Sequence, residues 1–104
     1  MIAYTVRCRF DDPMVGAEWI AWLVREHLAD VIAGGAIDAT VVQLDGDPLT
    51  CEVRYHFPTR AAFDRYERDH APALREEGLK QFPLERGLHY ERSVGEVMAN
   101  YPDA

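Results

Sequence analysis

The residue best placed to do chemistry is a histidine on the apolar side of a predicted helix. Within EWIAWLVREHLADVI each residue advances about 100° round the helix axis, so His27 falls in one stripe with Ile20, Val24 and Val31. Burial disfavours the charged imidazole, and the neutral ring that remains can act as a base or bind a metal or haem iron. More often, such a histidine is a core residue whose ring nitrogens bond a tyrosine hydroxyl or a backbone carbonyl.

The same pattern recurs around a second histidine. His70 follows Phe63 and Tyr66 with the i, i+3, i+7 spacing of a helix, although Pro72 lies only two residues further on. We therefore expect both imidazoles to point into the layer between helices and sheet, where they are the candidate catalytic residues. Nearby tyrosine hydroxyls complete the candidate ligand-binding set, which is His27, His70, Tyr4, Tyr55, Tyr66 and Tyr90.

Alternating apolar and polar residues predict the strands that must position these side chains. We expect strands over 2–10, 36–44, 50–57 and 86–95, and helices over 13–32 and 59–71, the second restarting at Pro72 and reaching 81. The order β-α-β-β-α-β with right-handed crossovers predicts one ferredoxin-like α+β domain over 1–104. Its four-stranded antiparallel sheet carries both helices on one face, toward which the apolar side of each strand should point. The closing YPDA should fray.

The other face of the sheet is expected to be open and strongly charged. It carries Thr5, Ser93 and the candidate dimer-interface set Arg7, Arg9, Glu52, Arg54, His56, His89 and Glu91. Such a face is often simply solvated, but mixed charges can also meet their own copies across the two-fold axis of a homodimer. Trp22 falls among the polar residues of the first helix, which predicts either a surface aromatic or an interface residue.

Composition argues against several classes of function. The formal net charge of −7 disfavours a nucleic-acid partner, because binding phosphates needs a basic surface. No apolar run approaches the roughly 20 residues of a membrane helix, and no signal peptide is recognisable, so the expected location is the cytoplasm. Cys8 and Cys51 lack CxxC spacing and fall on apolar strand positions, which predicts buried thiols. No HExxH or comparable spacing is present, so neither a metal nor a cofactor is predicted.

Three segments carry a resemblance to a bacterial family: EWIAWLVREHLADVIAGGAI, VRYHFPTRAAFDRYERDHAPALREEGLKQF and RGLHYERSV. Over nearly its whole length the chain resembles the domain of unknown function 4286, most specifically at Trp19, Trp22, His27 and the segment from His70 to Glu77. The resemblance implies a dimeric α+β barrel, in which two ferredoxin-like sheets pack face to face, and it brings no assigned activity. Wider relatives include cofactor-free monooxygenases of aromatic polyketides, lactone isomerases and haem-degrading oxygenases, but none of their catalytic motifs matches this chain.

Three functions follow as hypotheses. The first is a homodimer that binds a small aromatic or hydrophobic molecule in a pocket between sheet and helices. The second is a cofactor-independent oxygenase or isomerase, in which His27 or His70 abstracts a proton and a tyrosine hydroxyl stabilises the oxyanion. The third is a non-catalytic interaction or regulatory module that has no pocket, so that the dimer itself is the functional object.

Overall fold

Four strands and two long helical segments make up the computed structural model of the chain, which describes residues 1–102. The strands are β1 (Ile2–Phe10), β2 (Asp38–Gln43), β3 (Thr50–Phe57) and β4 (Leu88–Glu96). The first helical segment consists of α1 (Pro13–Trp22), a π-helical turn (Leu23–His27) and α2 (Leu28–Ala33). The second consists of α3 (Arg60–Asp69) and α4 (Ala71–Gln81), and a 3₁₀ turn (Leu84–Arg86) leads into β4. The fraying expected of YPDA falls partly on residues 103–104, which lie outside the described residues.

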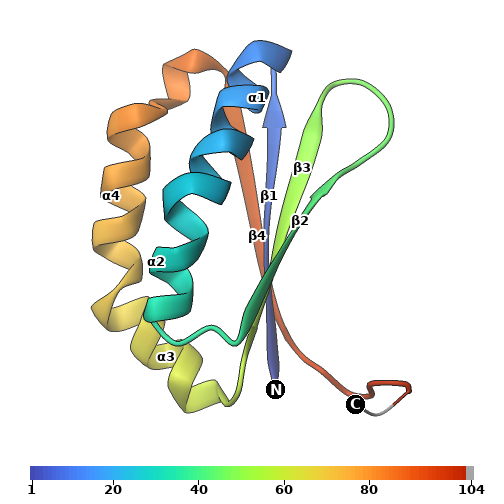
Figure 1. Cartoon of the computed structure of the whole chain (residues 1–104), viewed down its shortest axis with the longest axis vertical. Helices are drawn as coiled ribbons and strands as arrows, with labels where there is room; N and C mark the ends of the chain where they lie inside the picture. Colours follow the sequence, from blue (N-terminus) through green and yellow to red (C-terminus); the bar gives the residue numbers. More distant parts are fainter. Residues whose placement is uncertain (103–104) are drawn as a thin grey trace.

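The strands form one antiparallel sheet in the order β2-β3-β1-β4, and the helices cover a single face of it (Figure 1). This order places the two central strands, β3 and β1, between β2 and β4, as two right-handed β-α-β crossovers require. The ferredoxin-like fold predicted from the sequence is therefore confirmed. Within residues 1–102, no helix combines the length and the apolar character needed to cross a membrane.

The first helical segment presents to the sheet a stripe that repeats every four residues: Val15, Trp19, Leu23, His27 and Val31. In a regular α-helix each four-residue step would rotate this stripe by about 40°. The π-helical turn absorbs the drift, because its wider turn accommodates an extra residue. The prediction made for a regular helix is consequently wrong at two positions: Trp22 is buried, with 4% of its surface exposed, and Val24 is 68% exposed.

The second helical segment breaks at His70, the residue between α3 and α4. The Thr59 side chain caps the start of α3, where its hydroxyl accepts a hydrogen bond from the Ala62 N–H at 3.0 Å. Pro72 belongs to the first turn of α4, where its missing N–H costs nothing and a new helix can begin. The break turns His70 to the surface, where its ring is exposed and stacks beside Tyr66 at 6.4 Å. The prediction that His70 points into the layer is therefore wrong.

The helix-facing side of the sheet is built from rows of side chains in register across β3, β1 and β4: Tyr55–Tyr4–Val94, Val53–Val6–Arg92 and Cys51–Cys8–Tyr90. Tyr4 and Tyr55 are buried, which confirms that the apolar side of these strands faces the helices. Cys8 and Cys51 are fully buried free thiols, and burial raises the pKa of Cys8 to about 12, so it stays protonated.

Candidate functional site

The layer between sheet and helices contains a cavity of about 500 Å³. This volume lies in the range of small-molecule sites, about 300–1,000 Å³. Its floor is the sheet, with Tyr4, Val6, Val53, Tyr55, Tyr90 and Arg92. Its walls come from the helices, with Trp19, Trp22, Leu23, His27, Tyr66, Leu74, Arg75, Gly78 and Leu79. A largely aromatic lining with a few polar groups is typical of sites for small organic molecules.

The cavity exists because short side chains lie opposite one another in this layer. Val6 and Val53 form the centre of the floor, between the row Tyr55–Tyr4–Val94 and the row Cys51–Cys8–Tyr90. On the helix side Gly78 has no side chain, and a Cβ added there would lie 3.3 Å from the Trp22 ring. The glycine thus lets the indole lie close against α4. Larger residues at these positions would fill the space to the density of an ordinary core.

His27 lies in the cavity wall at the end of the π-helical turn. Its ring stacks on Trp22, with ring centroids 4.5 Å apart and planes inclined by 22°. Burial is the main cause that lowers the pKa of His27 below its usual 6.5, and the positive charge of Arg92 acts in the same direction. Asp30 opposes both, but the net effect is a lowered pKa. At neutral pH the ring is therefore an uncharged imidazole that can accept or donate a proton.

The two indole groups of the cavity differ in their hydrogen bonding. Trp19 Nε1 donates to the Tyr90 hydroxyl at 3.0 Å. Trp22 Nε1, in contrast, is buried and has no hydrogen-bond partner among the described residues. An unsatisfied buried donor costs about 1–3 kcal/mol, and such groups in folded proteins call for an explanation.

Tyrosine hydroxyls provide further polar groups. The Tyr4 hydroxyl accepts a hydrogen bond from Arg75 Nη2 at 3.2 Å, and Arg75 also pairs with the Glu67 carboxylate at 2.9 Å. Burial raises the pKa of Tyr55 and Tyr66 far above its usual value, and raises that of Tyr90 to about 12. These hydroxyls are therefore neutral near pH 7 and can donate hydrogen bonds.

Sequence reasoning missed the charged groups of the cavity. Arg92 lies on the same side of β4 as Leu88 and Tyr90, and its guanidinium lies 5.0 Å from the centroid of the Tyr90 ring. The alternation of β4 could have revealed this, because residues 88, 90 and 92 share one side of a strand. Arg75 could not have been found in this way, since α4 has no clear apolar stripe.

The structure brings most of the predicted ligand-binding residues together around one space. His27, Tyr4, Tyr55, Tyr66 and Tyr90 all line the cavity, whereas His70 does not. The third hypothesis, an interaction module without a pocket, loses its premise because the layer between sheet and helices contains a cavity. The roles of these residues in binding or catalysis stay predictions.

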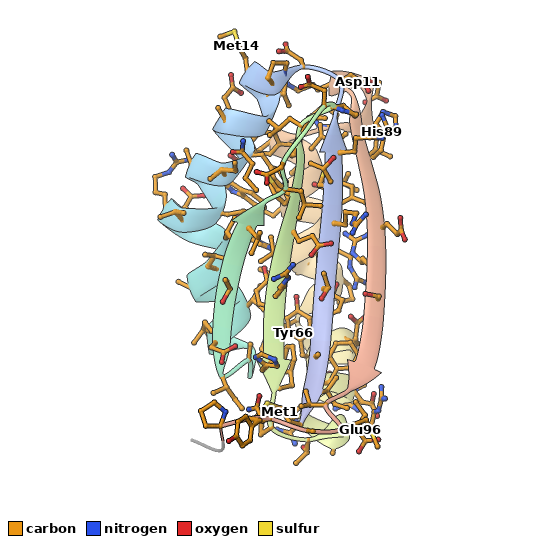
Figure 2. All side chains as sticks on the ribbon, turned by 90° about the vertical axis from the view of Figure 1, so that its right-hand side faces the viewer. Met1, Asp11, Met14, Tyr66, His89 and Glu96 are labelled. Atoms are coloured by element: carbon orange, nitrogen blue, oxygen red, sulfur yellow. The ribbon has the colours of Figure 1, made fainter. Side chains whose placement is uncertain are left out.

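The opposite, uncovered face of the sheet carries ion pairs (Figure 2). Glu52 is nearly buried between two arginines, with Arg7 Nη2 at 2.6 Å and Arg54 Nη2 at 2.8 Å. Hydrogen bonds from these arginines lower the pKa of Glu52, so it stays ionised. His56 Nδ1 lies 2.8 Å from a carboxylate oxygen of Asp38.

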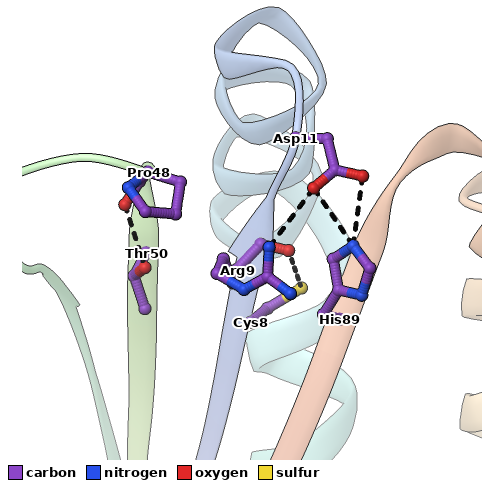
Figure 3. Close-up of polar contacts among 6 residues, drawn as sticks. All are labelled: Cys8, Arg9, Asp11, Pro48, Thr50 and His89. Carbon is purple, nitrogen blue, oxygen red and sulfur yellow. Dashed lines mark hydrogen bonds and ion pairs between the residues drawn. The ribbon is translucent and has the colours of Figure 1, made fainter.

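At one end of this face, a carboxylate joins two strands. The Asp11 side chain lies 3.3 Å from Arg9 Nη1 and 3.1 Å from His89 Nε2, and so links the end of β1 to β4 (Figure 3). The predicted interface residues Arg9 and His89 are thus engaged within the chain, and both remain on the surface. Glu91 is exposed on β4, opposite Arg7 of β1.

Solved structures similar to this chain share its fold. A dimeric ferredoxin-like protein from an uncultured marine organism is 13% identical, with a TM-score of 0.76 over 97% of this chain and 98% of the other. A single-residue variant of SnoaB, a cofactor-independent oxygenase from Streptomyces nogalater, is 13% identical, with a TM-score of 0.74 over 98% and 97%. HapK from Hahella chejuensis is 15% identical, with a TM-score of 0.71 over the whole of both chains.

At these identities the structural likenesses establish the fold alone. No curated protein matches the chain. The sequence profile of one family, described as Domain of unknown function (DUF4286), matches residues 1–92, which include the whole cavity lining and most of β4. The chain therefore belongs to the Domain of unknown function (DUF4286) family.

Proposed function

We propose that the protein is a homodimer in which each subunit binds a small aromatic or hydrophobic molecule in the cavity between sheet and helices. The observation that carries this proposal is the cavity of about 500 Å³ itself, whose lining combines aromatic and aliphatic side chains with a few polar groups. Flat rings offer a planar ligand favourable stacking, and polar side chains of the lining, among them His27 and Arg92, can form hydrogen bonds with it.

The dimer is proposed to form through the uncovered face of the sheet. Its clusters contain both signs of charge, with Glu52 between Arg7 and Arg54 and Asp38 beside His56. A patch of mixed charge can be complementary to its own copy across a two-fold axis. The similar marine protein is described as dimeric, which supports the same assembly here. Because the cavity lies on the helix side, this dimer would leave both cavities accessible.

Filling the cavity should abolish binding. Val6→Phe adds a ring at the centre of the floor, where the wild type has only a valine. A naphthalene-sized aromatic at ten times its Kd should raise the wild-type unfolding midpoint by about 5–10 °C, and should leave Val6→Phe unshifted in a thermal-shift assay. The matched control is Val24→Phe, at a position 68% exposed, which should keep the wild-type response. A broad panel of such compounds that shifts none of the three proteins would contradict the proposal.

One observation favours catalysis as a second candidate: His27 is a neutral imidazole in the cavity wall, in a fold shared with a cofactor-independent oxygenase. In this function His27 takes a proton from a carbon next to a carbonyl group, and the electron pair moves onto the carbonyl oxygen. A tyrosine hydroxyl stabilises the resulting enolate by hydrogen bonding. Return of the proton to another carbon of a conjugated enolate gives an isomer, whereas addition of dioxygen to the enolate carbon gives a peroxide that takes the proton back from His27 and becomes a hydroperoxide.

Proton abstraction can be measured without knowing the substrate. In D2O, wild-type protein should accelerate deuterium exchange into 2-tetralone, measured by mass spectrometry, and His27→Gln should reduce the acceleration by about 100- to 10,000-fold. Because the pKa of His27 is lowered, the rate should rise with pH through a value below 6.5 and stay level above it. His70→Gln, outside the cavity, should match wild type. Equal rates in the two variants would dismiss His27 as the base.

A further inference from the structure

The cavity differs in charge from the rest of the chain. The protein has a formal net charge of −7, yet the residues that line the cavity include Arg75 and Arg92 and no aspartate or glutamate. A cavity that presents only positive charge in an acidic protein attracts a negatively charged group and repels a cation.

The two arginines are not equivalent. Arg75 already has partners, because it pairs with Glu67 and donates to the Tyr4 hydroxyl. Arg92 forms no ion pair within 4.0 Å with any carboxylate of residues 1–102. Its guanidinium instead lies over the face of the Tyr90 ring, 5.0 Å from the ring centroid. Arg92 is therefore the cation of the cavity whose charge is not compensated within the chain.

Arg92 lies where a ligand's charged group would cost little to bind. It is the β4 member of the row Val53–Val6–Arg92, so its side chain begins at the edge of the cavity floor. The residue is exposed, and a carboxylate bound to it would stay partly hydrated, which limits the desolvation penalty of an ion pair. The apolar part of the same molecule would lie over the two valines, between the aromatic walls.

The other polar groups of the cavity suit oxygen acceptors as well. The buried hydroxyls of Tyr55 and Tyr66 stay protonated near neutral pH and can donate hydrogen bonds. The planar guanidinium of an arginine matches a carboxylate with two parallel hydrogen bonds, which a lysine cannot do.

We infer that the cavity binds an aromatic carboxylate, whose ring lies over Val6 and Val53 and whose carboxylate is bound by Arg92. This inference rests on the proposed function, since it names the class of molecule that the cavity takes.

The test compares 2-naphthoate with 2-naphthamide, which has the same ring and no charge, by isothermal titration calorimetry. Wild type should bind the acid about 10- to 100-fold more tightly than the amide, as expected for charged hydrogen bonds. Arg92→Gln should bind both probes equally. Arg25→Gln removes the same charge from an exposed position on the π-helical turn, where Arg25 pairs with Glu26, and it should keep the wild-type preference.

The possible failures are distinguishable. Equal affinities of wild type for acid and amide would overturn the anion subsite and leave the cavity proposal standing. A preference for the acid that survives in Arg92→Gln would overturn the role of Arg92. If neither probe binds wild type, both the cavity function and this inference fail. Melting curves of the variants show that they are folded.

Discussion

Replacing Trp19 with alanine should lower the free energy of unfolding by about 3–5 kcal/mol. Only 2% of the Trp19 surface is exposed, and its ring packs edge-on against Phe10 with centroids 5.3 Å apart. The substitution removes this contact, leaves the Tyr90 hydroxyl without its indole donor and enlarges a layer that already contains a cavity. Few neighbouring side chains can move into the vacated space, so the loss of unfolding free energy should fall at the upper end of this range.

The measurement is urea unfolding followed by circular dichroism, at one fixed protomer concentration because a dimer's stability depends on it. Trp19→Phe loses the hydrogen bond and part of the indole volume but keeps a ring against Phe10, so it should cost less than the alanine variant. Met14→Ala in the same helix, at a side chain 72% exposed, should change stability by less than about 0.5 kcal/mol. A Trp19→Ala variant as stable as Met14→Ala would show that the indole does not support the sheet–helix layer.

The architecture was predictable because the strands alternate. In β1, odd and even residues separate into a charged side and an apolar side, and the structure buries the apolar one. Glycine and proline mark the ends of the elements, as at Pro13 and Gly34. Four strands and two crossovers then leave few arrangements, since crossovers of one hand are strongly preferred.

The details of the first helix were not predictable from a regular period. A helical projection assumes 3.6 residues per turn throughout, whereas the buried stripe here repeats every four residues. Both Trp22 and Val24 were misplaced for that reason, and His27 was correctly placed because it lies on the four-residue stripe as well. In the sequence, a stripe of apolar residues and His27 at four-residue intervals over seventeen residues, from Val15 to Val31, was the available signal for a π-helical turn.

The candidate site could be predicted in part. The tyrosines and His27 were found because side-chain direction follows from position along a strand or helix. Arg92 was overlooked because an arginine on a strand is usually a solvated residue, although its place in the middle of β4 puts it on the same side as Leu88 and Tyr90. The volume of the cavity could not be inferred at all, because it depends on how closely α4 approaches Trp22 of α1 at Gly78.

Reversing the charge of Glu52 should convert the proposed dimer into monomers. Glu52 is the anion between Arg7 and Arg54 at the centre of the uncovered face. Glu52→Arg places three arginines together in each subunit, and a two-fold dimer would bring two such clusters against each other. Like charges opposed in an interface cost several kcal/mol, so the dimer dissociation constant should rise by at least about 100-fold.

Size-exclusion chromatography with light scattering at micromolar concentration measures this effect directly. Glu76→Arg makes the same charge change on α4, away from the uncovered face, at a side chain 73% exposed, and should remain dimeric.

Because Glu52→Arg also breaks two internal ion pairs, Ser93→Arg is needed as a second variant. It adds one positive charge to the same face, at an exposed position opposite Thr5, and leaves the Glu52 cluster intact. Dissociation of both Glu52→Arg and Ser93→Arg, with native circular dichroism, would place the interface on this face. A wild type that is monomeric at micromolar concentration, or dimers that persist in both variants, would contradict the proposed assembly.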